Sequence, residues 1–193
     1  GDKLTAIIAP AFVSQFGPDL TPEKLPAAMR ALGFQAVKEV AIGADLCTID
    51  EAADFMEKVP AELPFMATSC CPAWSVMVKK LYPDLRSTIS MALTPMVLTA
   101  RMVKRKYPDH KICFVGPCAA KKLEAMRRSI RSDVDFVLTY EELAGMFEAK
   151  NVDFATLEPA PGDKFGKGTA AGRGFAVSGG VAQDSGFQTP AFE

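Results

Sequence analysis

The sequence lacks a long hydrophobic run and carries almost no net charge. Its 22 lysine and arginine residues nearly balance its 23 aspartate and glutamate residues, so no strong field exists to attract nucleic acid or a membrane surface. The longest apolar runs, such as residues 4–12, are far shorter than the roughly 20 residues that a membrane-spanning helix needs. The first residues do not have the layout of a signal peptide. We therefore expect a cytoplasmic protein that binds neither nucleic acid nor membranes.

Histidine is nearly absent, and the cysteines do not form a zinc pattern. The single histidine, His110, lies in a polar segment and is expected on the surface, and no Cys-x-x-Cys pair occurs. Five cysteines without a secretory signal also argue against a disulfide scaffold. Cys47 and Cys113 lie in apolar surroundings, a turn and a strand, and are expected to be packing residues. The adjacent pair Cys70 and Cys71 is different, since in a reduced compartment it suggests metal or redox chemistry.

Short β-branched runs alternate with helical patterns over the first 150 residues. Strands are predicted at residues 4–8, 36–41, 64–67, 111–115 and 135–138. Helices are predicted at residues 22–32, 49–58, 75–81, 95–106 and 139–148, the first capped by Thr21 and ended by Gly33. This alternation predicts an α/β fold with a parallel sheet flanked by helices on both faces.

The composition changes after residue 150, which suggests a division of the chain. Residues 1–150 are expected to form an α/β lobe, and residues 151–193 a linker and the incomplete start of a remaining lobe. Residues 159–174 are rich in glycine, proline and alanine and are predicted to form a long loop. In parallel sheets, ligands collect beyond the carboxyl ends of the strands. Both cysteine motifs described next follow a predicted strand directly, which places them at that edge.

The most informative motif is the sequence Ser-Cys-Cys-Pro at residues 69–72. Thiolates are soft ligands that select iron–sulfur clusters, zinc or copper. Because the side chains of adjacent cysteines diverge, we interpret the pair as one metal ligand beside a thiol with another function. A buried cysteine beside a reactive one is the alternative, and the local pattern does not decide between the two.

Cys118 begins a second motif, Cys-Ala-Ala-Lys-Lys-Leu-Glu, between a predicted strand and a helix. Backbone N–H groups at such a turn, together with the cations of Lys121 and Lys122, would stabilise a thiolate. Glu124 closes the motif. A capped helix with solvated lysines is the simpler interpretation of this motif alone.

Taken together, the motifs resemble the signatures of iron-only ([FeFe]) hydrogenases. Residues 68–74 resemble the first cluster-binding signature, and residues 117–124 are similar to the second. Residues 9–11 and 94–96 resemble wall segments of the family's active-site pocket, and residues 177–181 resemble its glycine motif. The five matches cover nearly the whole chain, and chance similarity would not place all of them in this order.

The resemblance implies the first lobe of a two-lobed hydrogenase domain plus part of the second. The family's cofactor is a [4Fe–4S] cluster joined through a cysteine sulfur to a two-iron unit that carries CO, cyanide and a dithiolate. By this resemblance, Cys71 and Cys118 are ligands of the [4Fe–4S] cluster and Cys70 relays protons. Lys121 would donate a hydrogen bond to a cyanide. The other implied site residues are the lining residues Ala9, Pro10 and Pro95 and the proton-path residues Glu51, Asp54, Ser90 and Glu124.

Several positions depart from the family pattern. The third signature, which supplies the other two cluster cysteines, follows the glycine motif and is absent from this chain, which ends at Glu193. The chain by itself is therefore expected to be inactive and to hold an incomplete cofactor or none. Gly116 stands where many members have methionine, Met96 where glutamine is common, and Ala11 where serine is common. These changes suggest a divergent subgroup with altered activity, such as a hydrogen sensor.

The resemblance implies an enzyme of anaerobic hydrogen metabolism that reversibly reduces protons to H2. Its expected partners are ferredoxin or another electron carrier and the hydrogenase maturation proteins. One alternative is a hydrogen-sensing relative, and another is an iron–sulfur assembly factor related to the family. Assembly factors generally lack the doubled cysteine and the paired lysines, which disfavours the second alternative. A plain α/β domain with incidental cysteines is disfavoured by the ordered set of matches.

Overall fold

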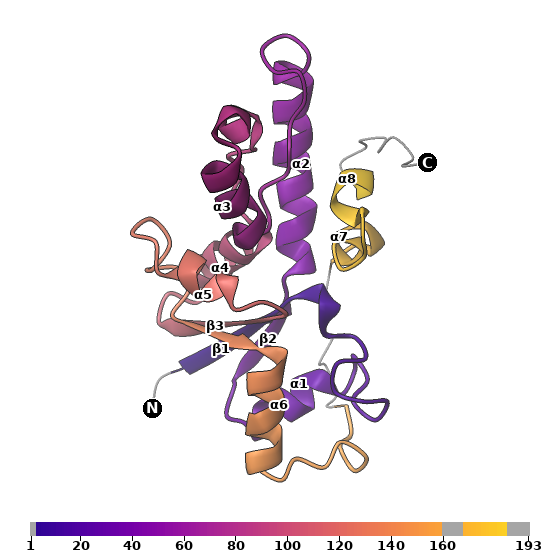
Figure 1. Ribbon diagram of the computed structural model, residues 1–193. Helices are drawn as coiled ribbons and strands as arrows, with labels where there is room; N and C mark the ends of the chain where they lie inside the picture. Colours follow the sequence, from indigo (N-terminus) through magenta and orange to yellow (C-terminus); the bar gives the residue numbers. More distant parts are fainter. Residues whose placement is uncertain (1–2, 160–167, 185–193) are drawn as a thin grey trace.

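Four parallel strands form the centre of the structure, a computed structural model that describes residues 3–159 and 168–184. The strands are β1 (Lys3–Ile8), β2 (Ala36–Glu39), β3 (His110–Gly116) and β4 (Phe136–Thr139), and their order in the sheet is β2-β1-β3-β4. Every neighbouring pair is parallel, with Ile8 beside both Glu39 and Val115, and Gly116 beside Thr139. The carboxyl ends of all four strands therefore meet at one edge of the sheet (Figure 1).

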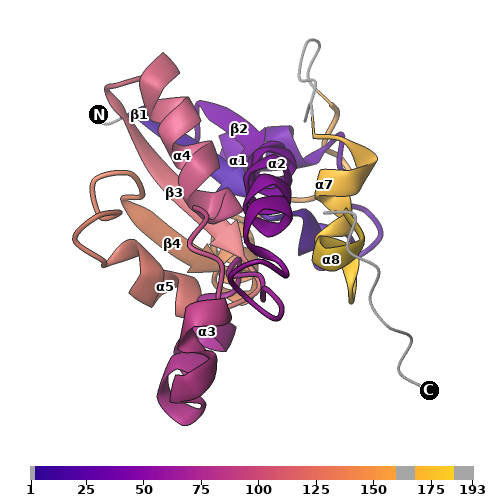
Figure 2. The same cartoon turned by 90° about the horizontal axis from the view of Figure 1, so that it is seen from above.

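Helices cover both faces of this sheet (Figures 1 and 2). One face is covered by α1 (Leu25–Ala31) and α6 (Tyr140–Ala149), and the other by α4 (Pro95–Lys106). Beyond the carboxyl edge lie α2 (Ala41–Lys58), α3 (Pro72–Leu81) and α5 (Ala120–Ala125), with the short helices α7 (Ala170–Gly174) and α8 (Gly180–Asp184) beside α2. Two 3-10 helices, η1 (Pro10–Phe12) and η2 (Pro83–Thr88), lie in the connections. The predicted α/β fold with a parallel sheet is confirmed.

The core lies on both faces of β1 and β3. Residues 6–8 and 112–115 are apolar and buried without a break, as expected for central strands that are covered on both sides. Phe16 contacts Tyr140 and Phe147 edge-on, at ring-centroid distances of 5.9 and 5.7 Å, which joins the loop after η1 to α6. None of the described helices combines the length and the hydropathy that a membrane span requires.

One predicted strand is absent. Residues 64–67 make a single isolated bridge, between Ala67 and Ile89, and do not join the sheet. The segment has four residues and begins with proline, which has no N–H group to donate to a sheet. The prediction that both cysteine motifs follow a strand is therefore right for Cys118 and wrong for Cys70, whose segment leads directly into α3.

Three helices begin elsewhere than predicted. α3 begins at Pro72 rather than after Trp74, because proline is favoured in the first turn of a helix. α1 begins at Leu25 rather than at residue 22, because the N–H groups of residues 24 and 25 both bond to Thr21 O and leave residues 22–24 in a turn. α2 begins at Ala41 rather than at residue 49, and the second strand ends earlier. Ala41, Ala44 and Cys47 give these first turns a small buried face at helical spacing. Cys47 is thus buried as predicted, but in a helix and not in a turn.

Two further expectations are corrected. His110 is half-buried at the start of β3 rather than solvated, with Nδ1 2.7 Å from Thr5 Oγ1 and its ring 4.9 Å from that of Tyr107. The predicted loop at residues 159–174 contains α7, while its residues 160–167 lie outside the described residues. The predicted division of the chain at residue 150 stays a prediction.

Candidate functional site

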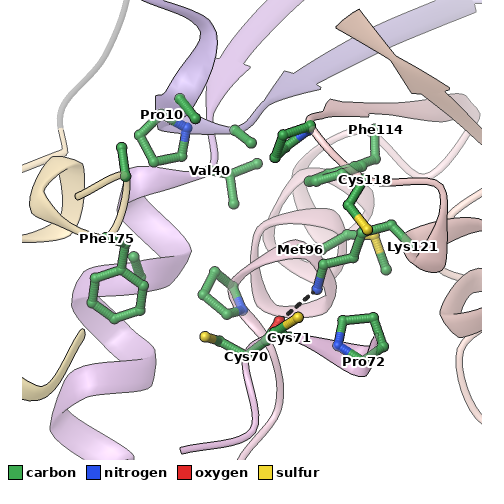
Figure 3. A pocket seen from close by; sticks show the side chains of 16 residues that line it. Pro10, Val40, Cys70, Cys71, Pro72, Met96, Phe114, Cys118, Lys121 and Phe175 are labelled. Atoms are coloured by element: carbon green, nitrogen blue, oxygen red, sulfur yellow. Dashed lines mark hydrogen bonds between the residues drawn. The ribbon is translucent and has the colours of Figure 1, made fainter. Parts of the chain in front are cut away.

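A cavity of about 200 Å³ lies at the carboxyl edge of the sheet (Figure 3). Its walls come from the ends of β1 and β3, from the first turns of α2, α4 and α5, from the start of α3 and from the segment after α7. The walls are mostly apolar, and their polar side chains are three thiols and one ammonium group. The lining residues are Ala9, Pro10, Ala11, Val40, Ala44, Cys70, Cys71, Pro72, Pro95, Met96, Phe114, Pro117, Cys118, Lys121, Phe175 and Ala176.

Three cysteines from two separate motifs meet in this cavity. Cys71 is extended at the N-cap of α3, where Pro72 is the first helical residue. Cys118 lies in the turn between β3 and α5, and its sulfur accepts a hydrogen bond from Ala120 N at 3.4 Å. Figure 3 shows the sulfur atoms of Cys70 and Cys71 pointing apart, with that of Cys71 on the side of Cys118. The structure thus brings the two predicted cysteine motifs together.

The three thiols differ in exposure. Cys70 is half-buried, whereas Cys71 and Cys118 are exposed. Burial is the main reason that the pKa of Cys70 is raised above its ordinary value; the cation of Lys121 opposes this shift and the charge of Glu51 adds to it. Cys70 is therefore held as a thiol at neutral pH, which suits a group that carries a proton. The exposed sulfurs of Cys71 and Cys118 are accessible to a metal.

Lys121 joins the two motifs through hydrogen bonds. Its Nζ donates to Cys70 O at 2.9 Å and to Glu124 Oε2 at 2.7 Å. Glu124 is 1% exposed, and its Oε1 accepts a hydrogen bond from Thr94 Oγ1 at 2.8 Å. Because a buried carboxylate is costly without partners, this network fixes the ammonium group at the cavity wall.

A second buried carboxylate lies on α2. Glu51 is fully buried, its Oε1 accepts from Ser69 N at 3.4 Å, and its side chain is hydrogen-bonded to Ser90. Burial raises the pKa of Glu51, against the effect of these hydrogen bonds. Asp54, one turn further along α2, is half-buried and forms an ion pair with Lys58 at 3.0 Å. Three of the predicted proton-path residues thus lie in or beside one helix that also contributes to the cavity wall.

The predicted lining residues are all in the wall. Ala9 follows β1 and donates its N–H to Val115 O at 2.9 Å, Pro10 begins η1, and Pro95 begins α4. Met96, which stands where glutamine is common in the family, is 1% exposed and also lines the cavity. These positions agree with the implied lining, while the roles of the individual site residues stay predictions.

The structure explains why residue 116 is glycine, which the sequence alone did not. A Cβ at this position would lie 2.5 Å from Cε1 of Phe114, so the ring of Phe114 takes the space that a side chain at residue 116 would need. Phe114 itself lines the cavity. Glycine at residue 116, where many family members have methionine, thus makes room for the ring of Phe114.

Sequence reasoning missed four other lining residues: Val40, Ala44, Phe175 and Ala176. Val40 and Ala44 belong to the first turns of α2, which were not predicted to be helical. Phe175 and Ala176 directly precede the glycine motif at residues 177–181. Their position next to this motif was the only sequence feature that could have indicated a place in the cavity wall. The motif itself provides Gly179, with φ of +75°, at the turn between α7 and α8.

The donor set fits part of the implied cofactor. Two exposed thiols of one cavity match two of the thiolates that a [4Fe–4S] cluster takes, and an ammonium group in an apolar wall suits an anionic ligand. Within residues 3–159 and 168–184, no group of three or more His, Cys, Asp or Glu side chains could hold a metal ion. The described residues therefore supply a partial set of ligands.

The fold and the cavity define an α/β domain with a thiol-bearing site at the carboxyl edge of a parallel sheet. Residues 2–189 match the family described as iron only hydrogenase large subunit, C-terminal domain. The chain belongs to this family.

Individual relatives include hydrogenases and an assembly factor. The chain is 35% identical over 195 residues to iron hydrogenase 1 of Clostridium pasteurianum, which covers 94% of this chain and 34% of the relative. It is 30% identical over 166 residues to the probable cytosolic Fe-S cluster assembly factor AAEL012261 of Aedes aegypti, which covers 76% of this chain and 34% of that relative. The chain thus spans about a third of the length of these curated relatives.

A solved structure agrees with the family. An apo [FeFe]-hydrogenase HydA1 from Chlamydomonas reinhardtii matches with a TM-score of 0.76 and 26% sequence identity. The match covers 100% of this chain and 56% of that chain. All described elements therefore belong to the hydrogenase fold, of which this chain spans about half.

Proposed function

We propose that this chain contributes the proton-relay thiol and two cluster ligands to an iron-only hydrogenase that reversibly reduces protons to H2. The observation that carries the proposal is the single cavity shared by Cys70, Cys71, Cys118 and Lys121 (Figure 3). The fold alone would not support this step, since relatives with the same fold include an assembly factor.

Cys71 and Cys118 are the residues that would hold a [4Fe–4S] cluster. When bound with its two-iron unit, the cofactor would pass on electrons from an external carrier and provide the metal site at which protons and H2 interconvert. Lys121 directs two of its three N–H donors to Cys70 O and Glu124, and the third would bond to an anionic ligand in the cavity. The apolar walls at Pro10 and Pro95 lower the local dielectric constant, which would strengthen this hydrogen bond.

Protons would reach the cavity through Asp54, Ser90, Glu51 and Cys70. Asp54 is half-buried, Ser90 and Glu51 share a hydrogen bond, and the charge of Glu51 acts on Cys70. Burial raises the pKa values of Glu51 and Cys70, which favours the protonated form of each group and suits a proton path. Glu124 remains a proposed member of a proton path, and its contacts with Lys121 and Thr94 favour a positioning role toward Lys121.

The proposed partners follow from the reaction. Electrons would come from ferredoxin or another carrier, and maturation proteins would supply the two-iron unit. An anaerobic, cytoplasmic setting fits the exposed thiols, which an oxidising environment would consume.

The test is H2 evolution by the full-length protein, with reduced methyl viologen as electron donor and a synthetic two-iron cofactor for maturation. Cys70→Ala is expected to lower turnover by roughly 100-fold or more without changing the iron content, because it removes a proton-transfer group. Cys113→Ala, which removes a buried thiol of β3 outside the cavity, is the control and should keep most of the activity.

A second candidate is an iron–sulfur protein without hydrogen turnover, acting as an assembly factor or as a sensor. The 30% identity to an assembly factor favours the first form, and the departures at Gly116 and Met96 favour the second. Absent turnover despite a full iron content would support the assembly factor. Slow turnover that is still abolished by Cys70→Ala would support the sensor.

A further inference from the structure

Two carboxylates attach residues 168–173 to the end of β2 and the start of α2. In Figures 1 and 2, α7 and α8 lie along α2, on the side opposite to α3 and α4. The contact is made by Glu39, at the end of β2, and by Asp45, in the first turns of α2. We refer to Glu39 and Asp45 together as the carboxylate clamp.

Asp45 holds the start of α7. Its Oδ1 accepts hydrogen bonds from Thr169 Oγ1 at 2.6 Å and from Gly172 N at 3.0 Å, and its Oδ2 accepts from Thr169 N at 3.0 Å. Thr169 is also the N-cap residue of α7. A helix of five residues has little stability of its own, so the position of α7 depends on contacts such as these.

Glu39 holds the end of α7. Its side chain is 7% exposed, and its two oxygens accept from Arg173 Nε at 3.2 Å and Arg173 Nη2 at 3.1 Å. Glu39 Oε2 also accepts from Gly168 N at 3.3 Å. Pairing through both guanidinium donors fixes direction as well as distance. The clamp therefore holds α7 at both ends.

Two glycines allow the backbones to approach closely. A Cβ at Gly172 would overlap with Ala41 O and with Asp45 Oδ1, and a Cβ at Gly168 would lie 2.5 Å from Ala41 Cβ. The absence of side chains at both positions lets Asp45 reach the N–H groups of α7. Charge, hydrogen bonding and backbone fit thus agree on one placement of this segment.

This placement determines part of the cavity wall. Phe175 is the C-cap residue of α7, and Phe175 and Ala176 line the cavity together with residues of the sheet edge (Figure 3). All other lining residues lie between residues 9 and 121. The segment beyond residue 150 therefore closes the cavity through Phe175 and Ala176.

We propose that Glu39 and Asp45 are positioning residues: by attaching α7 to the end of β2 and the start of α2, they hold Phe175 in the cavity wall and so control access from solvent to the Cys70 thiol. The inference rests on the proton-relay role proposed above for Cys70, since such a thiol works only where bulk water and other reagents are kept out. Neither carboxylate lines the cavity, so their effect is exerted through Phe175.

The test is the rate at which iodoacetamide alkylates each cysteine of the metal-free chain at one pH, measured by peptide mass spectrometry. Asp45→Ala is expected to raise the rate at Cys70 roughly tenfold or more, because the loss of hydrogen bonds to a charged group increases the population in which α7 is detached. The rates at the exposed Cys71 and Cys118 should not change. Asp45→Asn keeps one acceptor oxygen and should restore most of the protection, and Glu57→Gln, an exposed carboxylate of the same helix, should have no effect.

Phe175→Ala is the second variant, because it opens the wall without touching the clamp. It should also accelerate alkylation of Cys70, and Asp45→Ala should add little in its background. If Phe175→Ala leaves the Cys70 rate unchanged, or if Asp45→Ala accelerates all three cysteines alike, the proposal is wrong. Hydrogen turnover is not part of this readout, so failure of the proposed function would leave the expected rates as they are.

Discussion

At the scale of single residues, Glu51 combines burial with an incompletely paired carboxylate. Its carboxylate is fully buried, and among the described residues its Oε2 has no hydrogen-bond partner. Burial raises its pKa above the ordinary value of 4.5. Between pH 4.5 and the raised pKa, the folded protein binds more protons than the unfolded chain. The free energy of unfolding therefore falls as the pH rises through this range.

We expect Glu51→Gln to increase the free energy of unfolding at pH 8 by about 1 kcal/mol, because an incompletely paired charge is no longer buried. Near pH 4, where Glu51 is mostly protonated in both states, the two proteins should be equally stable. Urea denaturation at the two pH values measures this difference, with Glu57→Gln on the exposed side of α2 as the control. An equal gain at both pH values would show that the charge of Glu51 is not its cause.

At the scale of elements, the site depends on the close approach of α2 and α4. A Cβ at Gly43 of α2 would overlap with Thr99 Oγ1 and Pro95 O of α4. Pro95 lines the cavity, and Glu51 lies about two turns further along α2. This helix contact therefore sets the relative position of the cavity wall and the proposed proton path.

Gly43→Ala is expected to lower the free energy of unfolding by about 2 kcal/mol, because the overlap outweighs the higher helix propensity of alanine. Gly145→Ala in α6 is the matched variant, since nothing lies within 4 Å of a Cβ at that position. It should raise the free energy of unfolding by about 0.5–1 kcal/mol. Denaturant titration of both variants separates packing from propensity, and a stabilising Gly43→Ala would mean that the two helices lie further apart.

The sequence predicts those elements best that carry strong local signals. α4 begins at the predicted proline, Pro95, and α6 begins with a capping box between Thr139 and Glu142. The start of α2 has no side-chain cap that would mark it in the sequence. Its small buried residues indicate a helix only when their packing against α4 is known. Phe175 could not be placed because Asp45 and Thr169, which position its helix, are 124 residues apart in sequence.

At the scale of the whole molecule, the sheet brings the site together. Cys118 follows β3, the central strand beside β1, and Cys71 begins α3 beyond the same edge. The motifs predict which thiols matter, but the distance between them in space depends on the path of residues 59–71. Within this segment the sequence pattern wrongly predicted a strand at residues 64–67. The described residues bring three thiols to a single cavity, two of them proposed cluster ligands and one a proposed proton relay. If these roles are right, loss of one ligand should weaken binding of the whole cofactor.

We therefore expect Cys71 and Cys118 to be equally necessary for cluster binding in the full-length protein. Cys71→Ser and Cys118→Ser should each lower the iron and sulfide content after anaerobic reconstitution by roughly half or more, because a hard oxygen replaces a soft thiolate. The visible absorption of the cluster should fall in parallel, while Cys113→Ala, outside the cavity, should retain both. Unchanged iron in either serine variant would mean that the cavity thiols are not cluster ligands, and that this chain shares the hydrogenase fold without its mode of cluster binding.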